Sequence, residues 1–157
     1  MIFVAVGTQF PFDRLIRCVD TWAKANNIPA HAQIADGEYL PEHASWDRFM
    51  TTDEFNSKLN QASLIISHAG MGNIITALEN QKPIIVMNRQ HKLGEHRNDH
   101  QADGLAWMGK LSGVYTARDC EELNNHLSQF STLQASHHLD MPQRQQLIDF
   151  IDSAIQG

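Results

Sequence analysis

The sequence predicts an α/β fold in which one parallel sheet is covered by helices on both faces. Short apolar runs such as 2–6, 64–66 and 83–87 are typical of strands buried on both sides. Segments with apolar residues at helical spacing alternate with these runs, as parallel strands require. The chain has 157 residues, 42% of them hydrophobic, and no internal repeat. We therefore expect a single domain over residues 1–157 with its own core.

The sequence of the first half of the chain predicts two helices and four strands. The strands are expected at 2–6, 30–35, 45–50 and 64–66, and the helices at 12–24 and 53–62. The first helix carries its apolar residues at the spacing of one face: Leu15, Ile16, Val19 and Trp22. Asp13 is the expected N-cap of that helix, and Thr52 or Asp53 that of the second.

The second half continues the alternation. A short helix follows the glycines near residue 70, and further elements are expected as a strand at 83–87, a helix at 97–110, a strand at 113–115 and helices at 118–130 and 142–155. A polar connector over 131–139 precedes the last helix, which begins at Pro142. Its apolar face (Leu147, Ile148, Ile151 and Ile155) either packs on its own domain or meets a partner, as the first helix also could.

Charge and cysteine content restrict the class of protein. A net charge of −6 argues against a nucleic-acid surface, which needs a basic stripe to neutralise phosphates. Cys18 and Cys120 lie far apart without CxxC spacing, so we expect two reduced thiols and a cytoplasmic protein. The apolar run at the N-terminus is too short for a signal sequence or a membrane span.

The most informative stretch is the glycine-rich segment between the strand at 64–66 and the next helix. Gly70 and Gly72 let a ligand approach the backbone closely, and the start of the following helix offers unpaired N–H groups and a positive dipole end. This arrangement suits a diphosphate, which predicts a nucleotide-type ligand. The alternative is a tight strand-to-helix turn that needs glycine for its backbone geometry alone.

Four segments together resemble a known family. They are VAVGT at 4–8, ISHAGMG at 66–72, KPIIV at 82–86 and EHRNDHQ at 95–101. In this order they are similar to the C-terminal, donor-binding domain of glycosyltransferase family 28, which is a Rossmann-like half of a GT-B fold. The resemblance covers nearly the whole chain. It is strongest to small stand-alone subunits of split enzymes, such as bacterial exopolysaccharide transferases and the soluble subunit of the dolichyl-diphosphate GlcNAc transferase.

The resemblance implies an inverting transfer of a hexose from a UDP-sugar to a lipid-linked acceptor, presumed to be a polyprenyl-diphosphate sugar, in surface or exopolysaccharide synthesis. It implies no cofactor and no catalytic metal, because helix and loop amides stabilise the leaving UDP. A membrane-associated N-terminal half would be the partner, and it would recruit this chain to the cytoplasmic face of the membrane. The transferred sugar and any homo-oligomer stay open.

The resemblance also assigns roles to residues. The diphosphate-binding positions are Gly7, Thr8, His68, Gly70, Met71, Gly72 and Asn73. Thr76 stands where many relatives carry a ribose-binding glutamate, and Glu79 lies three residues further along. The sugar-contacting positions are Glu95, His96, Asp99, His100 and Gln101. The resemblance assigns no catalytic residue: His68 is a candidate, and the general base is expected on the partner.

Several alternatives stay open from the residues alone. His68 can be a structural histidine, and Asn98 or Asp99 can cap a helix. His96 and His100 at i and i+4 suit a metal hydrolase, but no HExxH motif is present and no third ligand is fixed. The chain can also be a binding subunit that holds the nucleotide without turnover of its own.

Overall fold

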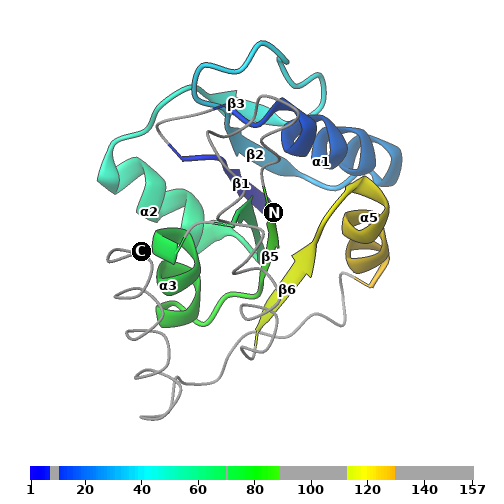
Figure 1. Cartoon of the computed structure of the whole chain (residues 1–157). Helices are drawn as coiled ribbons and strands as arrows, with labels where there is room; N and C mark the ends of the chain where they lie inside the picture. Colours follow the sequence, from blue (N-terminus) through cyan, green and yellow to red (C-terminus); the bar gives the residue numbers. More distant parts are fainter. Residues whose placement is uncertain (8–10, 70, 89–112, 130–157) are drawn as a thin grey trace, which may run out of the picture.

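The computed structural model describes residues 1–7, 11–69, 71–88 and 113–129 (Figure 1). Its elements are β1 (Ile2–Ala5), α1 (Asp13–Asn26), β2 (Ala30–Gln33), β3 (Ser45–Asp47), α2 (Thr52–Gln61), β4 (Leu64–His68), α3 (Met71–Glu79), β5 (Ile84–Met87), β6 (Val114–Ala117) and α5 (Cys120–Ser128). The elements predicted within these ranges are confirmed, with ends displaced by a few residues. The helices predicted at 97–110 and 142–155 lie outside the described residues.

The six strands form one parallel sheet in the order β3-β2-β1-β4-β5-β6, which confirms the predicted fold class. β1 is central, and its Phe3 is in register with His31 of β2 and Ile65 of β4. The chain builds outward from β1 to β3 and then returns to place β4 on the other side of β1. The strand order therefore reverses between β1 and β4, and ligands of open parallel sheets bind at such a point.

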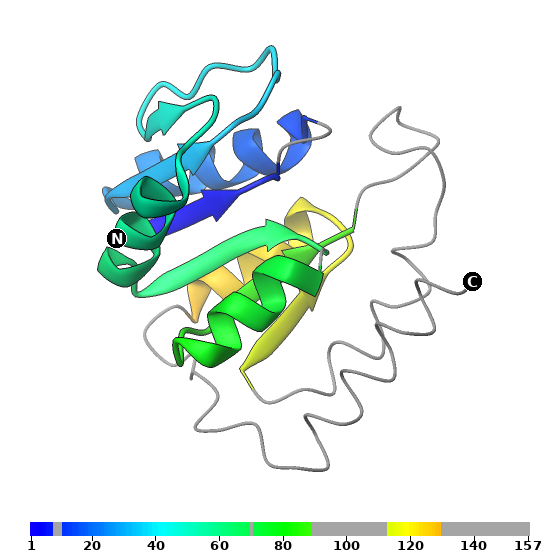
Figure 2. The same ribbon diagram turned by 90° about the vertical axis from the view of Figure 1, so that its left-hand side faces the viewer.

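Alternate residues of the inner strands β1, β4 and β5 supply two separate cores, as the period of a strand requires. On one face, Ile2 and Val4 belong to a cluster with residues of α1 and α5, such as Leu15 and Leu123. On the other face, Phe3 lies in a second cluster with residues of α2 and α3. Figures 1 and 2 show these two helix pairs on opposite sides of the sheet. The expectation of helices on both faces is confirmed.

The N-caps of the first two helices differ from the prediction. Thr51, rather than Thr52 or Asp53, caps α2, and its hydroxyl accepts a hydrogen bond from the amide of Glu54 at 3.2 Å. Asp13 is the first residue of α1 instead of its cap, and its Oδ2 accepts from the amide of Glu38 at 3.2 Å. The carboxylate is thus used by a loop distant in sequence, which local spacing does not report.

Asp20 organises the loop between β2 and β3. This buried α1 residue accepts hydrogen bonds from the backbone amides of Glu42, His43 and Ala44 at 2.9–3.1 Å and from the hydroxyl of Tyr39 at 2.8 Å. Burial alone raises the pKa of Asp20, but these donors outweigh it and hold the pKa below its ordinary value. Burial and the Asp20 carboxylate raise the pKa of Tyr39 to about 12. The ionised carboxylate therefore stabilises the loop.

The expectation of two separate thiols is wrong. Cys18 of α1 and Cys120 of α5 form a disulfide with their Cα atoms 5.8 Å apart, a usual distance for such a bond. The two residues are 102 positions apart in the sequence. They meet because α1 and α5 pack side by side on the same face of the sheet, a tertiary contact that cysteine spacing cannot reveal.

Candidate functional site

The candidate site lies where the carboxyl ends of β1 and β4 meet. Gly7 follows β1, His68 is the last residue of β4, and α3 begins at Met71. Because the strand order reverses here, the two strand ends diverge into connections on opposite sides of the sheet, which opens a crevice at this edge. The topology thus brings together the two segments in which the sequence predicted phosphate-binding residues.

Gly7 and His68 are in close contact within this site. Gly7 has a φ of +86°, and a Cβ at this position would lie 3.1 Å from Nε2 of His68. The position therefore demands glycine twice, once for its backbone conformation and once for the space that the imidazole takes. His68 lies against the first loop and supports it, which is consistent with the structural alternative named for this histidine.

Gln33 holds the Gly7 loop, a role that was not predicted from the sequence. This buried residue ends β2, next to β1, and its Oε1 accepts hydrogen bonds from the amides of Val6 at 3.2 Å and Gly7 at 3.1 Å. Its Nε2 donates to the carbonyls of Gly7 and Arg48, both at 2.9 Å. One signal in the sequence could have indicated this role. Gln33 is a polar residue at the end of a buried strand, and that strand lies beside the one that leads to Gly7.

Asn73 ties the first turn of α3 to the end of β4. Its Nδ2 donates to the hydroxyl of Ser67 at 2.8 Å, and this buried hydroxyl donates to the carbonyl of His68 at 2.8 Å. Asn73, predicted as a diphosphate ligand, is thus partly engaged in fixing where the helix begins. The hydrogen bonds place the amino end of α3 at the carboxyl edge of the sheet.

Gly72 leaves the first turn of α3 open. A Cβ built at this position meets none of the described atoms within 4 Å, and the residue is exposed. The glycine is therefore not needed for packing against the described residues, in contrast to Gly7. An approaching ligand has room beside the helix start, where unpaired amides and the helix dipole favour an anion.

A small cavity of about 180 Å³ opens beside these residues. It is lined by residues from the ends of β1 and β2, the segment before α2, and α2 and α3: Gly7, Gln33, Met50, Phe55 and Asn73. Phe55 also packs its ring against Phe3 at 5.1 Å between centroids, which fixes one wall. The cavity combines apolar walls from the start of α2 with polar groups of β2 and α3.

Thr76 and Glu79 lie differently with respect to this site. Thr76 is one turn into α3, and its hydroxyl donates to the carbonyl of Gly72 at 2.8 Å. Glu79 is the last residue of α3 and lies seven positions after Gly72, or about 10 Å along the helix axis. The structure therefore places Thr76 near the candidate site and Glu79 at the opposite end of the helix.

The other predicted site residues lie outside the described residues. These are Thr8, Gly70, Glu95, His96, Asp99, His100 and Gln101. The backbone of Met71 starts α3, but its side chain is not described. Within the described ranges, no three His, Cys, Asp or Glu side chains gather as metal ligands would. No helix in that part of the chain is long and apolar enough to cross a membrane.

Curated relatives match part of the chain. The human "UDP-N-acetylglucosamine transferase subunit ALG13" is 33% identical over 107 residues, which cover 61% of this chain and 9% of the human protein. The ALG13 subunit of Debaryomyces hansenii is 33% identical over 61 residues, 39% of this chain and 28% of that protein. The chain thus spans less than a third of the length of these relatives.

Solved structures show the same fold. An NMR structure of ALG13 superposes with a TM-score of 0.65 at 19% identity, covering 93% of each chain. The crystal structure of Acinetobacter baumannii MurG gives a TM-score of 0.60 at 13% identity, covering 84% of this chain and 42% of that one. Residues 1–147 match the profile of the glycosyltransferase family 28 C-terminal domain. The chain therefore belongs to glycosyltransferase family 28, as a representative of its C-terminal domain.

Proposed function

We propose that this chain is the donor-binding and catalytic subunit of a two-subunit inverting glycosyltransferase. It transfers a hexose or N-acetylhexosamine from a UDP-sugar to a lipid-linked acceptor in surface or exopolysaccharide synthesis. Membership of family 28 supports transferase chemistry, and the ALG13 relatives are named as subunits of a UDP-N-acetylglucosamine transferase. The observation that carries the proposal is the open amino end of α3 at the point where the strand order reverses.

The diphosphate of the donor binds at the first turn of α3. The amides of this turn have no partners within the helix, and their dipole favours negative charge. Gly72 leaves the space that phosphate oxygens need to reach those amides. Asn73 and Ser67 fix the helix start, so the amides keep their direction before the ligand arrives.

The cavity beside Gly7 receives another part of the donor. At about 180 Å³ it is smaller than the 300–1,000 Å³ typical of pockets that enclose a whole ligand, so most of the donor stays in the crevice. The side chains of Met50 and Phe55 offer apolar surface for a flat ring. We therefore place the uridine end of the donor toward this cavity and the sugar away from it.

The reaction then follows from charge stabilisation. The acceptor hydroxyl oxygen attacks the anomeric carbon, the bond from that carbon to the diphosphate oxygen breaks, and UDP leaves with the bonding electrons. The helix amides stabilise the charge that develops on the leaving group, and no cofactor takes part. A general base accepts the proton of the acceptor hydroxyl, and we expect the partner to supply it across the crevice.

The proposed partner is a membrane-associated N-terminal half of the GT-B fold. It would bind the polyprenyl-diphosphate acceptor and hold this chain at the cytoplasmic face of the membrane. The family match covers only the C-terminal domain type, which is the half that this chain supplies. His96, His100 and their neighbours keep the proposed role of contacting the donor sugar.

Calorimetric titration of the purified chain with UDP and with ADP tests the donor site. The proposal predicts selective binding of UDP that is unchanged by EDTA, because helix amides rather than a metal hold the diphosphate. Binding that is lost with EDTA would replace the amide site with a metal site. Equal binding of ADP would remove the assignment of uridine to the cavity.

A further inference from the structure

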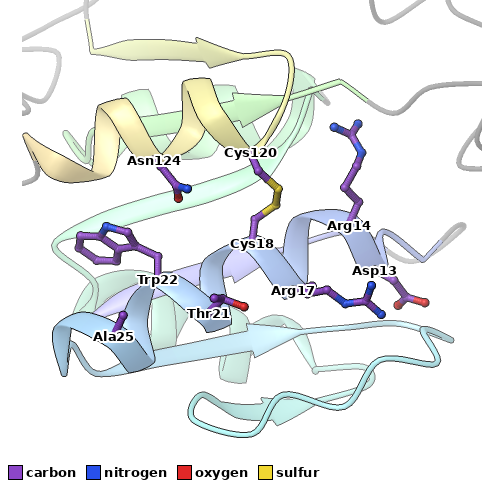
Figure 3. A pocket seen from close by; sticks show the side chains of 9 residues that line it. All are labelled: Asp13, Arg14, Arg17, Cys18, Thr21, Trp22, Ala25, Cys120 and Asn124. Carbon is purple, nitrogen blue, oxygen red and sulfur yellow. A yellow bond between two sulfur atoms is a disulfide. The ribbon is translucent and has the colours of Figure 1, made fainter.

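A second cavity lies beside α1. It is a groove of about 740 Å³ between α1 and α5, and Figure 3 shows the side chains that line it. We call it the α1–α5 groove; Trp22 of α1 and Asn124 of α5 lie toward one end, and Arg14 and Arg17 toward the other. The Cys18–Cys120 disulfide lies between these ends and forms part of the wall.

The two cysteines of this bond differ in exposure. Cys18 is buried at 8% exposure, whereas Cys120 is only partly buried. Cys120 is therefore the more accessible of the two residues to a small thiol that enters the α1–α5 groove. Cys120 is also the first residue of α5, after the N-cap Asp119, and the helix dipole there favours the Cys120 thiolate when it is released in the second step of an exchange.

The charges at the groove favour an anionic visitor. Arg17 is exposed, and its guanidinium lies 5.0 Å from the ring centre of Tyr39. Arg14 is held by hydrogen bonds from its two terminal nitrogens to the carbonyls of Arg118 and Asn88, at 3.1 and 3.0 Å. Asp13 is the one acidic residue among those that line this groove in the described part of the chain. The lining thus carries two cations against one anion, while the carboxylates of Asp119, Glu121 and Glu122 beside Cys120 lie outside the lining.

From these observations we propose that the α1–α5 groove is a thiol–disulfide exchange site for a small anionic thiol of the glutathione class. The thiolate of the visitor attacks Sγ of Cys120, which forms a mixed disulfide and breaks the bond to Cys18. The Cys18 thiolate leaves and takes up a proton. A second small thiol attacks the visitor's sulfur and releases the Cys120 thiolate. Two electrons reduce the protein disulfide, and two small thiols become one disulfide.

The exchange would loosen one helix from another. The disulfide joins α1 to α5, and α5 follows directly after β6, an edge strand of the sheet. Without the bond, the packing of Leu123 and Leu127 and the contacts of Arg14 remain to hold α5 in place. The oxidised and reduced chains should therefore share one fold and differ in stability.

The test uses the full oxidised chain with glutathione and with cysteamine, a small cationic thiol. Mass spectrometry follows the mixed disulfide, and both rates are divided by those for a linear disulfide peptide. We expect glutathione to be favoured at least about threefold after this correction, with its adduct on Cys120. Arg17→Gln should remove the preference, while Lys24→Gln, an exposed cation on the same helix outside the groove, should keep it.

Three results would overturn the proposal. Alkylation of both cysteines without a reductant would show that no disulfide is present. An adduct on Cys18, or a glutathione preference that survives in Arg17→Gln, would remove the exchange site or its charge selectivity. A second pair of variants tests access in proteins that cannot form the Cys18–Cys120 disulfide. When both are treated with oxidised glutathione, Cys18→Ser should form an adduct at Cys120 faster than Cys120→Ser forms one at Cys18.

Discussion

Gln33 holds Gly7 by both ends of its side-chain amide. Its Oε1 accepts from the amide of Gly7 at 3.1 Å, and its Nε2 donates to the carbonyl of the same residue at 2.9 Å. A side chain of β2 thus fixes the loop after β1 in the conformation that faces His68. The loop at the candidate site is held by hydrogen bonds that form only when the sheet is assembled.

Gln33→Leu should destabilise the protein by about 2–4 kcal/mol, because it leaves several buried backbone groups without their hydrogen bonds. Urea unfolding measures the change. Gln61→Leu on the exposed surface of α2 is the matched control and should stay within about 0.5 kcal/mol of the parent chain. Equal stability of the two variants would show that the amide does not hold the loop.

Alanine should have opposite effects at the two described glycines of the site. Gly7→Ala introduces a side chain at positive φ and against His68, so it should cost at least about 1 kcal/mol. Gly72→Ala meets open space in a helix and should be neutral or stabilising by up to about 1 kcal/mol. Thermal unfolding of both variants checks the contrast, and a large loss of stability at Gly72 would contradict it.

Asp20 should make stability depend on acid pH. Its pKa in the folded protein lies below its ordinary value near 3.8, so its contribution is complete above about pH 5 and is lost as pH falls below 4. Asp20→Asn should be less stable at pH 7 by about 1–3 kcal/mol and should lose less than the parent on acidification. Urea unfolding at pH 7 and pH 3 measures both. Parallel losses in the two proteins would exclude this role.

The isolated chain should transfer little or no sugar to a lipid-linked acceptor. It supplies one half of the crevice, and the proposed base and acceptor site belong to the other half. Radiolabelled UDP-N-acetylglucosamine and UDP-glucose with a polyprenyl-diphosphate acceptor provide the assay, with and without the membrane-associated half. Appreciable transfer by this chain alone would refute the split enzyme. Absence of transfer by the complex, with UDP still bound, would favour a binding subunit without turnover.

The apolar strands and the strand-to-helix glycines could be predicted from the sequence because their signals are local. Ile65 and Ile66 lie in an apolar run, which indicates a strand buried on both faces, and the two residues belong to the two different cores. The reversal of strand order is a common feature of α/β topology. Gly7 was predicted as a site residue through the family resemblance. Its contact with His68 explains physically why that position must be glycine.

The missed features depend on residues that meet only in the folded chain. Gln33 lies 26 residues from Gly7, and Cys18 lies 102 residues from Cys120. Neither pair leaves a local pattern, since strand pairing in one case and helix packing in the other creates the contact. The prediction of Asp13 as a cap was wrong because it used local spacing alone. The spacing suits α1, but the carboxylate of Asp13 accepts a hydrogen bond from the distant amide of Glu38. The predicted contacts of His100 and Gln101 with the donor sugar stay predictions.

The central claim is that the donor diphosphate binds at the open first turn of α3, and Gly72→Leu tests it most directly. Leucine is a good helix former and meets no described atom near its Cβ, so the fold should persist while the side chain fills the ligand's space. Calorimetry should show at least about a tenfold loss of UDP affinity, or about 1.4 kcal/mol, with unchanged urea unfolding. UDP binding of parental strength in a folded Gly72→Leu protein would contradict the claim.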